Sequence, residues 1–197
     1  MRRLGLILCL LALAGAIDAF VHRRIVQSPG VLAVDAPLQS APASQAAIRI
    51  GKFELLPLAD FSLEARVLSR ADYQLGTESE LSSTDLALGW GRMSDSAVIS
   101  QLDISQSGRF YSYRWRGEPP IPAADIVVSS ANMHVIPADA AVAEAIARVR
   151  VGEVIALRGE LVEARRPDGW RWRSSLRRDD SGAGACELVL VDSIEPR

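Results

Sequence analysis

Three extended segments near the C-terminus constrain the fold of this chain more than any other feature. They cover residues 154–164, 170–176 and 185–191, and each is rich in β-branched, aromatic or other apolar side chains. Turn sequences, Pro167-Asp168-Gly169 and Asp179-Asp180-Ser181-Gly182, separate them. Gly159 interrupts the first segment, which is typical of a bulge or a sharp bend. We therefore predict a three-stranded antiparallel meander, with a small OB-like barrel as one way for it to curl.

The middle segment alternates tryptophan with arginine. In a strand, neighbouring side chains point to opposite faces, so Trp170 and Trp172 share one face. The other face carries Arg171, Arg173 and Arg177. We expect the tryptophans to be substantially buried in the core and Arg171 and Arg173 to be exposed. The three arginines are the candidate binding residues.

The rest of the body mixes helix and strand signals. Alternation predicts strands over 61–67 and 109–116, and a short extended segment over 132–136. Ser82-Ser83-Thr84-Asp85 resembles a helix start, which predicts a short helix over 86–88. Further short helices are expected over 94–102, where Val98-Ile99 would also suit a strand, and over 122–129. A longer helix is expected over 138–150, where Val142, Ile146 and Val149 form one apolar stripe. The predicted class is α+β.

The N-terminus predicts a membrane segment. Residues 4–21 are almost wholly apolar and have arginines on both sides. We favour an uncleaved anchor, residues 1–24, over a cleaved signal peptide or a buried helix. Residues 25–47 contain three prolines among alanine, serine and glutamine, which predicts a flexible tether. The globular body then covers residues 48–197.

The sequence offers few groups for catalysis. The chain has two histidines, His22 and His134, and two cysteines, Cys9 and Cys186, so we predict no metal, no cofactor and no disulfide framework. A hydrolase in which Cys186 is the nucleophile and His134 the base remains the alternative, with Asp179 or Asp180 orienting the imidazole. A cysteine in an apolar strand is more often a small core residue.

Charge is distributed unevenly along the chain. The formal net charge is −2, yet nine arginines and four acidic residues lie between Arg148 and Arg178, a local balance of +5. A basic strand face would suit an anionic lipid headgroup, an envelope glycan or a partner protein of the envelope. Nucleic acid is an unlikely ligand for a body outside the cytoplasm.

Four stretches of the body resemble a group of uncharacterised bacterial proteins that have an N-terminal membrane segment. They are Leu86-Ala87-Leu88-Gly89-Trp90-Gly91, Ser130-Ala131-Asn132-Met133-His134, Trp172-Arg173-Ser174-Ser175-Leu176 and Gly184-Ala185-Cys186-Glu187. The resemblance implies a bacterial envelope protein and no site residues. The leading hypothesis is a non-enzymatic binding module, held in the bacterial inner membrane by a single pass through residues 4–21, with its body in the periplasm.

Overall fold

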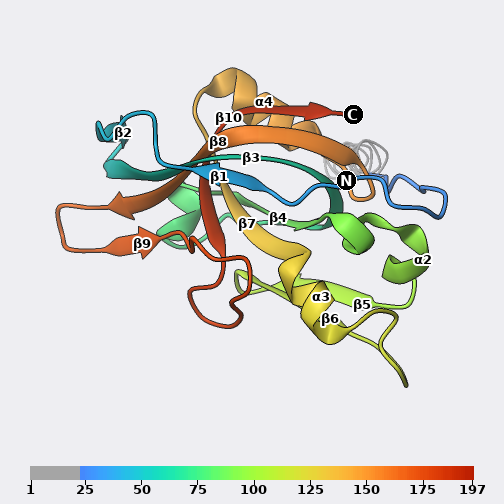
Figure 1. Cartoon of the computed structure of the whole chain (residues 1–197). Helices are drawn as coiled ribbons and strands as arrows, with labels where there is room; N and C mark the ends of the chain where they lie inside the picture. The colour runs from blue at the N-terminus through green and yellow to red at the C-terminus, as the bar shows by residue number, and fades with distance from the viewer. Residues whose placement is uncertain (1–22) are drawn as a thin grey trace, which may run out of the picture.

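A computed structural model describes residues 23–197, which form a β-rich body (Figure 1). The strands are β1 (Leu38–Ser40), β2 (Ile48–Ile50), β3 (Phe53–Asp72), β4 (Thr84–Gly89), β5 (Asp103–Ser107), β6 (Phe110–Arg114), β7 (Ser130–Pro137), β8 (Val154–Arg165), β9 (Arg171–Arg173) and β10 (Glu187–Pro196). The α-helices are α2 (Ser96–Ile99), α3 (Ala123–Val128) and α4 (Ala140–Arg148). Two 3₁₀ turns, η1 (Glu78–Glu80) and η2 (Gly91–Ser94), complete the elements of this part of the chain.

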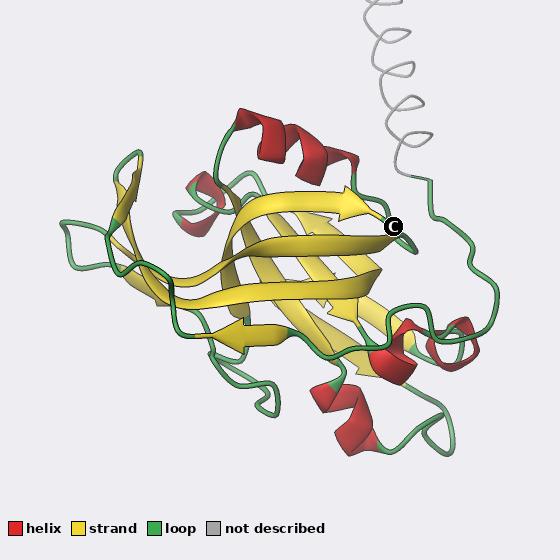
Figure 2. Cartoon of the chain, turned by 45° about the horizontal axis from the view of Figure 1, so that its top comes forward, coloured by secondary structure: helices red, strands yellow, loops and turns green. Residues whose placement is uncertain are grey.

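The predicted α+β class is wrong, because strands dominate the body. Strands make up 43% of the structure and helices 15%, and most of the strands belong to one mixed sheet. The helices are short and lie at the edges of that sheet rather than forming a layer of their own (Figure 2). The long β3 has 20 residues and pairs with four other strands, β1, β2, β4 and β8.

Five of these strands close into a ring. The order is β3-β4-β7-β10-β8, and β8 returns to β3 through an antiparallel ladder. The β7–β10 pair is parallel and the other four pairs are antiparallel. The loop from β7 to β8 contains α4, whose Val142 and Ile146 join the side chains inside the ring. A closed five-stranded ring of this kind fits an OB-like barrel.

The C-terminal strands have a different order from the predicted meander. All three segments are extended, and β9 runs antiparallel to β8, as expected; β10 also runs antiparallel to β8, whereas a meander would have these two strands run in the same direction. However, β8 lies between β9 and β10, and the edge of β10 that does not contact β8 pairs with β7. At Gly159 the β8 and β10 backbones approach so closely that a Cβ would lie 1.9 Å from the carbonyl oxygen of Leu190. The glycine therefore permits this pairing.

The short helix predicted over residues 86–88 is also wrong. Those residues belong to β4, and all six residues of that strand are buried. Leu86 and Leu88 face the inside of the ring, while Ala87 packs under the insertion between β4 and β7. A strand covered on both faces shows no alternation, so its apolar run cannot be told from a buried helix by periodicity.

Other predicted elements are confirmed with shifted ends. The strand expected over 61–67 is the centre of β3, and the aromatic strand over 109–116 is β6. The helices expected at 94–102, 122–129 and 138–150 are α2, α3 and α4. Asp139 caps α4 by accepting a hydrogen bond from the Val142 amide, so the helix begins after it.

The segment that we expected to be a flexible tether is held against the body. The Ile25 amide donates to the carbonyl oxygen of Val151 at 2.8 Å, and the Ala33 amide donates to Ser94 Oγ at 3.1 Å. Further along, β1 adds to the edge of β3. Within residues 23–197, no helix is both long and apolar enough to cross a membrane. The predicted anchor, residues 4–21, lies outside the described residues.

Candidate functional site

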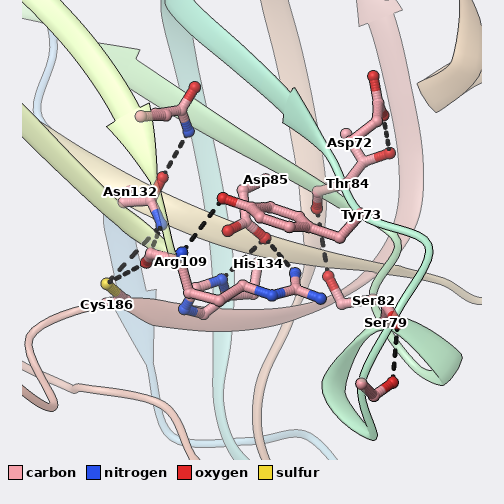
Figure 3. A network of polar contacts seen from close by, with 12 residues as sticks. Asp72, Tyr73, Ser79, Ser82, Thr84, Asp85, Arg109, Asn132, His134 and Cys186 are labelled. Atoms are coloured by element: carbon pink, nitrogen blue, oxygen red, sulfur yellow. Dashed lines mark hydrogen bonds and ion pairs between the residues drawn. The ribbon is translucent and has the colours of Figure 1, made fainter.

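A buried charge network lies on the outer face of β4 and β7. Asp85 and His134 are directly paired across these strands. Asp85 is fully buried, and its Oδ1 lies 2.9 Å from His134 Nδ1 and 2.8 Å from Arg109 Nη1. Figure 3 shows the three side chains converging, with Arg109 reaching in from the turn of the β5–β6 hairpin. One buried carboxylate thus joins the barrel to the hairpin that packs on it.

The backbone at Arg109 is strained. The hairpin turn consists of Gly108 and Arg109, with φ values of 57° and 72°, and Arg109 is the one non-glycine residue with a positive φ in the part of the chain that the structure describes. A left-handed conformation costs a side-chain-bearing residue about 1–2 kcal/mol. The Arg109 guanidinium lies 3.9 Å from the centre of the Tyr73 ring and pairs with Asp85. These contacts offset the strain and fix the hairpin.

Asn132 links the network to Cys186. Its Oδ1 accepts a hydrogen bond from Gln106 Nε2 at 2.7 Å, and its Nδ2 donates to the Arg109 carbonyl oxygen at 3.1 Å. The Cys186 sulfur lies 3.8 Å from both Asn132 Nδ2 and that carbonyl oxygen. Burial is the main cause that raises the pKa of the Cys186 thiol to about 11; the hydrogen bond from the Asn132 amide opposes the rise, and the neighbouring carboxylates add to it. The sulfur is therefore a protonated thiol at neutral pH.

The geometry does not favour the predicted pair of Cys186 and His134. Within residues 23–197, the thiol has no hydrogen bond to the imidazole; His134 instead bonds to Asp85 and packs against Trp172, with ring centres 4.6 Å apart. A nucleophilic cysteine needs a lowered pKa and a positive neighbour. Cys186 has a raised pKa and acidic neighbours. Asp179 bonds to Arg177 and Asp180 to Ser175, so neither orients the imidazole.

A cavity of about 110 Å³ opens beside this network. It lies between β6 and β7 on one side and the loop from β9 to β10 on the other. One wall is aromatic and is formed by Trp90, Phe110, Tyr111 and Tyr113. The other is polar and is formed by Arg177, Arg178, Asp180 and Glu187, with Asn132 and Cys186 between the two walls. The cavity therefore combines flat apolar rings with several hydrogen-bonding groups.

Glu187 is the most unusual group in the cavity. Its side chain is 1% exposed, and its Oε1 pairs with Arg178 Nη1. Glu187 Oε2 and Arg178 Nε are both buried, and neither has a hydrogen-bond partner among the described residues. Burial raises the pKa of Glu187 to about 8, against the opposing effect of Arg178. Buried polar groups nearly always have partners, so this pair points to a missing donor and a missing acceptor.

The predicted basic face is a mixed charged surface. Arg171 and Arg173 are exposed, as expected. However, Arg173 Nη1 pairs with Glu163 Oε2 at 2.5 Å, and Arg165 pairs with the other oxygen of the same carboxylate. Arg177 donates to both oxygens of Asp179, at 2.9 and 3.0 Å. The structure therefore neutralises two of the three candidate arginines, and it brings Arg177 to the cavity instead of to the β9 face.

The tryptophans of the middle segment point inward but are only half-buried. Trp170 packs edge-on against Phe53, with ring centres 5.5 Å apart, and Trp172 covers His134. Both pack against a second apolar cluster formed by the ends of β3, β8 and β10. The prediction that they face the core is confirmed, although Trp172 also covers one side of the charge network.

Sequence reasoning missed Asp85, Arg109, Asn132 and Glu187 as site residues. The available signal was a single charged residue at the edge of an apolar strand, as in Thr84-Asp85-Leu86-Ala87-Leu88 and Glu187-Leu188-Val189-Leu190-Val191. A charged side chain in such a position is buried only when an opposite charge or a hydrogen-bonding group pairs with it. The sequence could not show the partners, which come from distant loops.

Comparison with known proteins leaves the site to be interpreted from its geometry. No protein-family model matches the chain, and neither a curated protein nor a solved structure matches it.

Proposed function

We propose that the protein is a membrane-anchored binding module that holds an envelope glycan in the aromatic-walled cavity. The observation that carries the proposal is the composition of the lining: aromatic rings, among them exposed Phe110, share one cavity with buried groups whose hydrogen bonds are incomplete. A sugar ring has an apolar face of C–H groups and an edge of hydroxyls that both donate and accept. Aromatic rings suit the face, and Glu187 with Arg178 suits the edge.

The position of the cavity agrees with the fold. OB-like barrels bind oligosaccharides or oligonucleotides on the face of their second and third strands and on the flanking loops. In the ring, β4 and β7 are the second and third strands in chain order, and Asn132 on β7 lies at the cavity. This step is an analogy between folds, and the composition of the walls supports it independently.

The charges around the cavity favour a glycan over the anionic ligands that the sequence also suggested. Arg177 and Arg178 contribute +2 and Asp179 and Asp180 contribute −2, while Glu187, with a pKa of about 8, is mostly protonated at neutral pH, so the formal balance is close to zero. The cavity therefore has no net positive charge to attract the phosphates of nucleic acid or of an anionic lipid headgroup. The raised pKa of Cys186 also makes binding a better interpretation than hydrolysis.

The membrane anchor and the periplasmic body remain part of the proposal. They are supported by the apolar run of residues 4–21, with arginines on either side. They also agree with a glycan ligand, because cell-envelope glycans lie outside the cytoplasm.

A glycan-binding assay on the full-length protein in detergent micelles tests the proposal. Phe110 is 49% exposed, so Phe110→Ala removes one ring of the cavity at little cost to folding. We expect this variant to lose at least about tenfold in affinity, in line with the loss of a stacking contact worth roughly 1.4 kcal/mol or more. The matched control is Leu75→Ala, which truncates an apolar side chain that is 91% exposed and does not line the cavity. The proposal is refuted if no envelope glycan binds, or if Phe110→Ala binds as tightly as the wild type.

A further inference from the structure

We propose that the sugar recognised in the cavity carries a free amine next to a hydroxyl group, as an amino sugar does. This inference rests on the proposed function, since it specifies which glycan the cavity holds. It is argued from the unfilled hydrogen bonds of Glu187 and Arg178 and from the charge of Asp180.

Glu187 and Arg178 leave two hydrogen-bonding positions open in one ion pair. When Glu187 is ionised, its Oε2 needs a donor, and Arg178 Nε needs an acceptor; the two residues are already joined through Glu187 Oε1 and Arg178 Nη1. Both open atoms are buried, so a ligand reaches them by displacing the Arg178 side chain, which is 20% exposed. Adjacent ammonium and hydroxyl groups on one sugar ring would then supply both partners: the ammonium group would donate to Glu187 and favour its ionised form, and the hydroxyl oxygen would accept from Arg178.

The charge at the cavity also bears on the ligand. Asp180 accepts a hydrogen bond from Ser175 Oγ at 2.6 Å, and no ion pair joins it to any residue of the described chain. The nearby cations, Arg177 and Arg178, are each paired with another carboxylate. One negative charge at the cavity is thus left without a direct partner. An ammonium group would compensate that charge, whereas a neutral sugar would not.

Aromatic side chains line the same cavity as the carboxylates. The faces of aromatic rings attract cations, and Phe110, Tyr111 and Tyr113 are among the lining residues. An acetylated amine would also offer one donor and one acceptor, but it would carry no charge. Aromatic rings together with a carboxylate that has no ion-pair partner therefore favour the free amine over the amide.

The size of the cavity limits how much of the ligand enters. Its volume of about 110 Å³ is smaller than the roughly 150 Å³ of an engineered cavity that admits benzene. The cavity therefore accommodates the amine-bearing edge of one sugar unit rather than a complete disaccharide. The rest of the glycan would lie outside, close to Phe110, which lines the cavity and is exposed.

The test compares three short oligomers with the full-length protein in detergent micelles: glucosamine, N-acetylglucosamine and glucose trimers. We expect the glucosamine trimer to bind at least about tenfold more tightly than the other two, the gain of one partly buried charge-assisted contact. Asp180→Asn keeps the shape of the side chain and its contact with Ser175, and it should reduce the preference to less than about threefold. Asp35→Asn is the control for net charge, because Asp35 is exposed and distant from the cavity. Its preference should equal that of the wild type.

Each outcome bears on a different claim. Equal binding of all three trimers overturns the amine inference and leaves the proposed glycan function in place. An unchanged preference in Asp180→Asn, or an equal loss in Asp35→Asn, overturns the role assigned to the Asp180 charge. Binding of none of these trimers, nor of any envelope glycan, refutes the proposed function itself.

Discussion

The Arg109 turn provides the most direct test of how the hairpin is held against the barrel. Arg109→Ala removes the cation that pairs with the fully buried Asp85 carboxylate. Breaking a buried ion pair from one side costs about 3–5 kcal/mol. The Arg109 side chain is 17% exposed and His134 stays on the same carboxylate, so we expect the lower part of that range, about 3–4 kcal/mol.

Arg109→Gly separates the ion pair from the backbone strain. Glycine loses the same contact, but it adopts a φ of 72° without steric cost. It should therefore be about 1 kcal/mol more stable than Arg109→Ala. Urea unfolding of the full-length protein in detergent, followed by tryptophan fluorescence, measures both differences. A value for Arg109→Ala within about 0.5 kcal/mol of the wild type would refute the stabilising role of the network. Equal stability of the two variants would refute the strain.

Three further predictions concern single groups. The pKa of the Glu187 carboxyl is about 8 in the folded protein, above the ordinary 4.5, so the folded state binds this proton more tightly than the unfolded state does. The free energy of unfolding should therefore fall as the pH rises from 4.5 to 8. Thermal melts from pH 5 to 9 should show this slope in the wild type and a shallower one in Glu187→Gln; identical slopes would contradict it. Gly159→Ala places a Cβ 1.9 Å from the Leu190 carbonyl oxygen and should lower the free energy of unfolding in urea by about 1–3 kcal/mol. A variant as stable as the wild type would show that β8 and β10 can separate freely. Gly152→Ala places a Cβ 2.0 Å from the Ile25 carbonyl oxygen, at a φ of +89°, and should push the N-terminal segment away from the body. Trypsin should then cleave faster after Arg24. An unchanged cleavage rate would mean that the segment is not held at Gly152.

The elements that sequence patterns predicted well are those with one buried and one exposed face. In β3, alternation around Phe61–Val67 is clear because one side of the strand faces the inside of the ring. In α4, the stripe of Val142, Ile146 and Val149 has a helical spacing for the same reason. By contrast, β4 is buried on both faces, so the pattern that separates helix from strand is missing.

The order of the C-terminal strands could not be predicted from local patterns. The parallel pair of β7 and β10 joins segments that are separated by α4, β8 and β9, and it depends on contacts distant in sequence. Short turns between neighbouring strands favoured a simple meander. Closure of the ring instead puts β8 between β9 and β10, which leaves β9 as a short edge strand. The sequence indicated a curled sheet and a bulge or bend at Gly159, but neither the close backbone approach at that residue nor which edges meet.

The site shows the same limit in its side chains. The density of tryptophan and arginine drew attention to the middle segment, and Trp172 does cover His134. Its exposed arginines are largely neutralised by Glu163 and Asp179. Glu187 and Arg178, two of the groups with unfilled hydrogen bonds, lie at the start of the next strand and in the loop before it. Their importance follows from burial and pairing, which local composition does not reveal.

The arrangement of the ends relates the cavity to the anchor. The N-terminal segment meets the body at Val151 and Gly152, close to where β10 ends, since Arg197 donates to the carbonyl oxygen of Val154. The cavity lies at Glu187, where β10 begins. Figure 1 shows the C-terminus and the loop from β9 to β10 at separate ends of that strand. Ten residues at about 3.3 Å each put at most roughly 30 Å between them, because β10 bends. If the proposed anchor precedes residue 25, the cavity would lie at the end of β10 that is farther from that attachment, which agrees with the proposal of an envelope glycan rather than a lipid headgroup of the same membrane as its ligand.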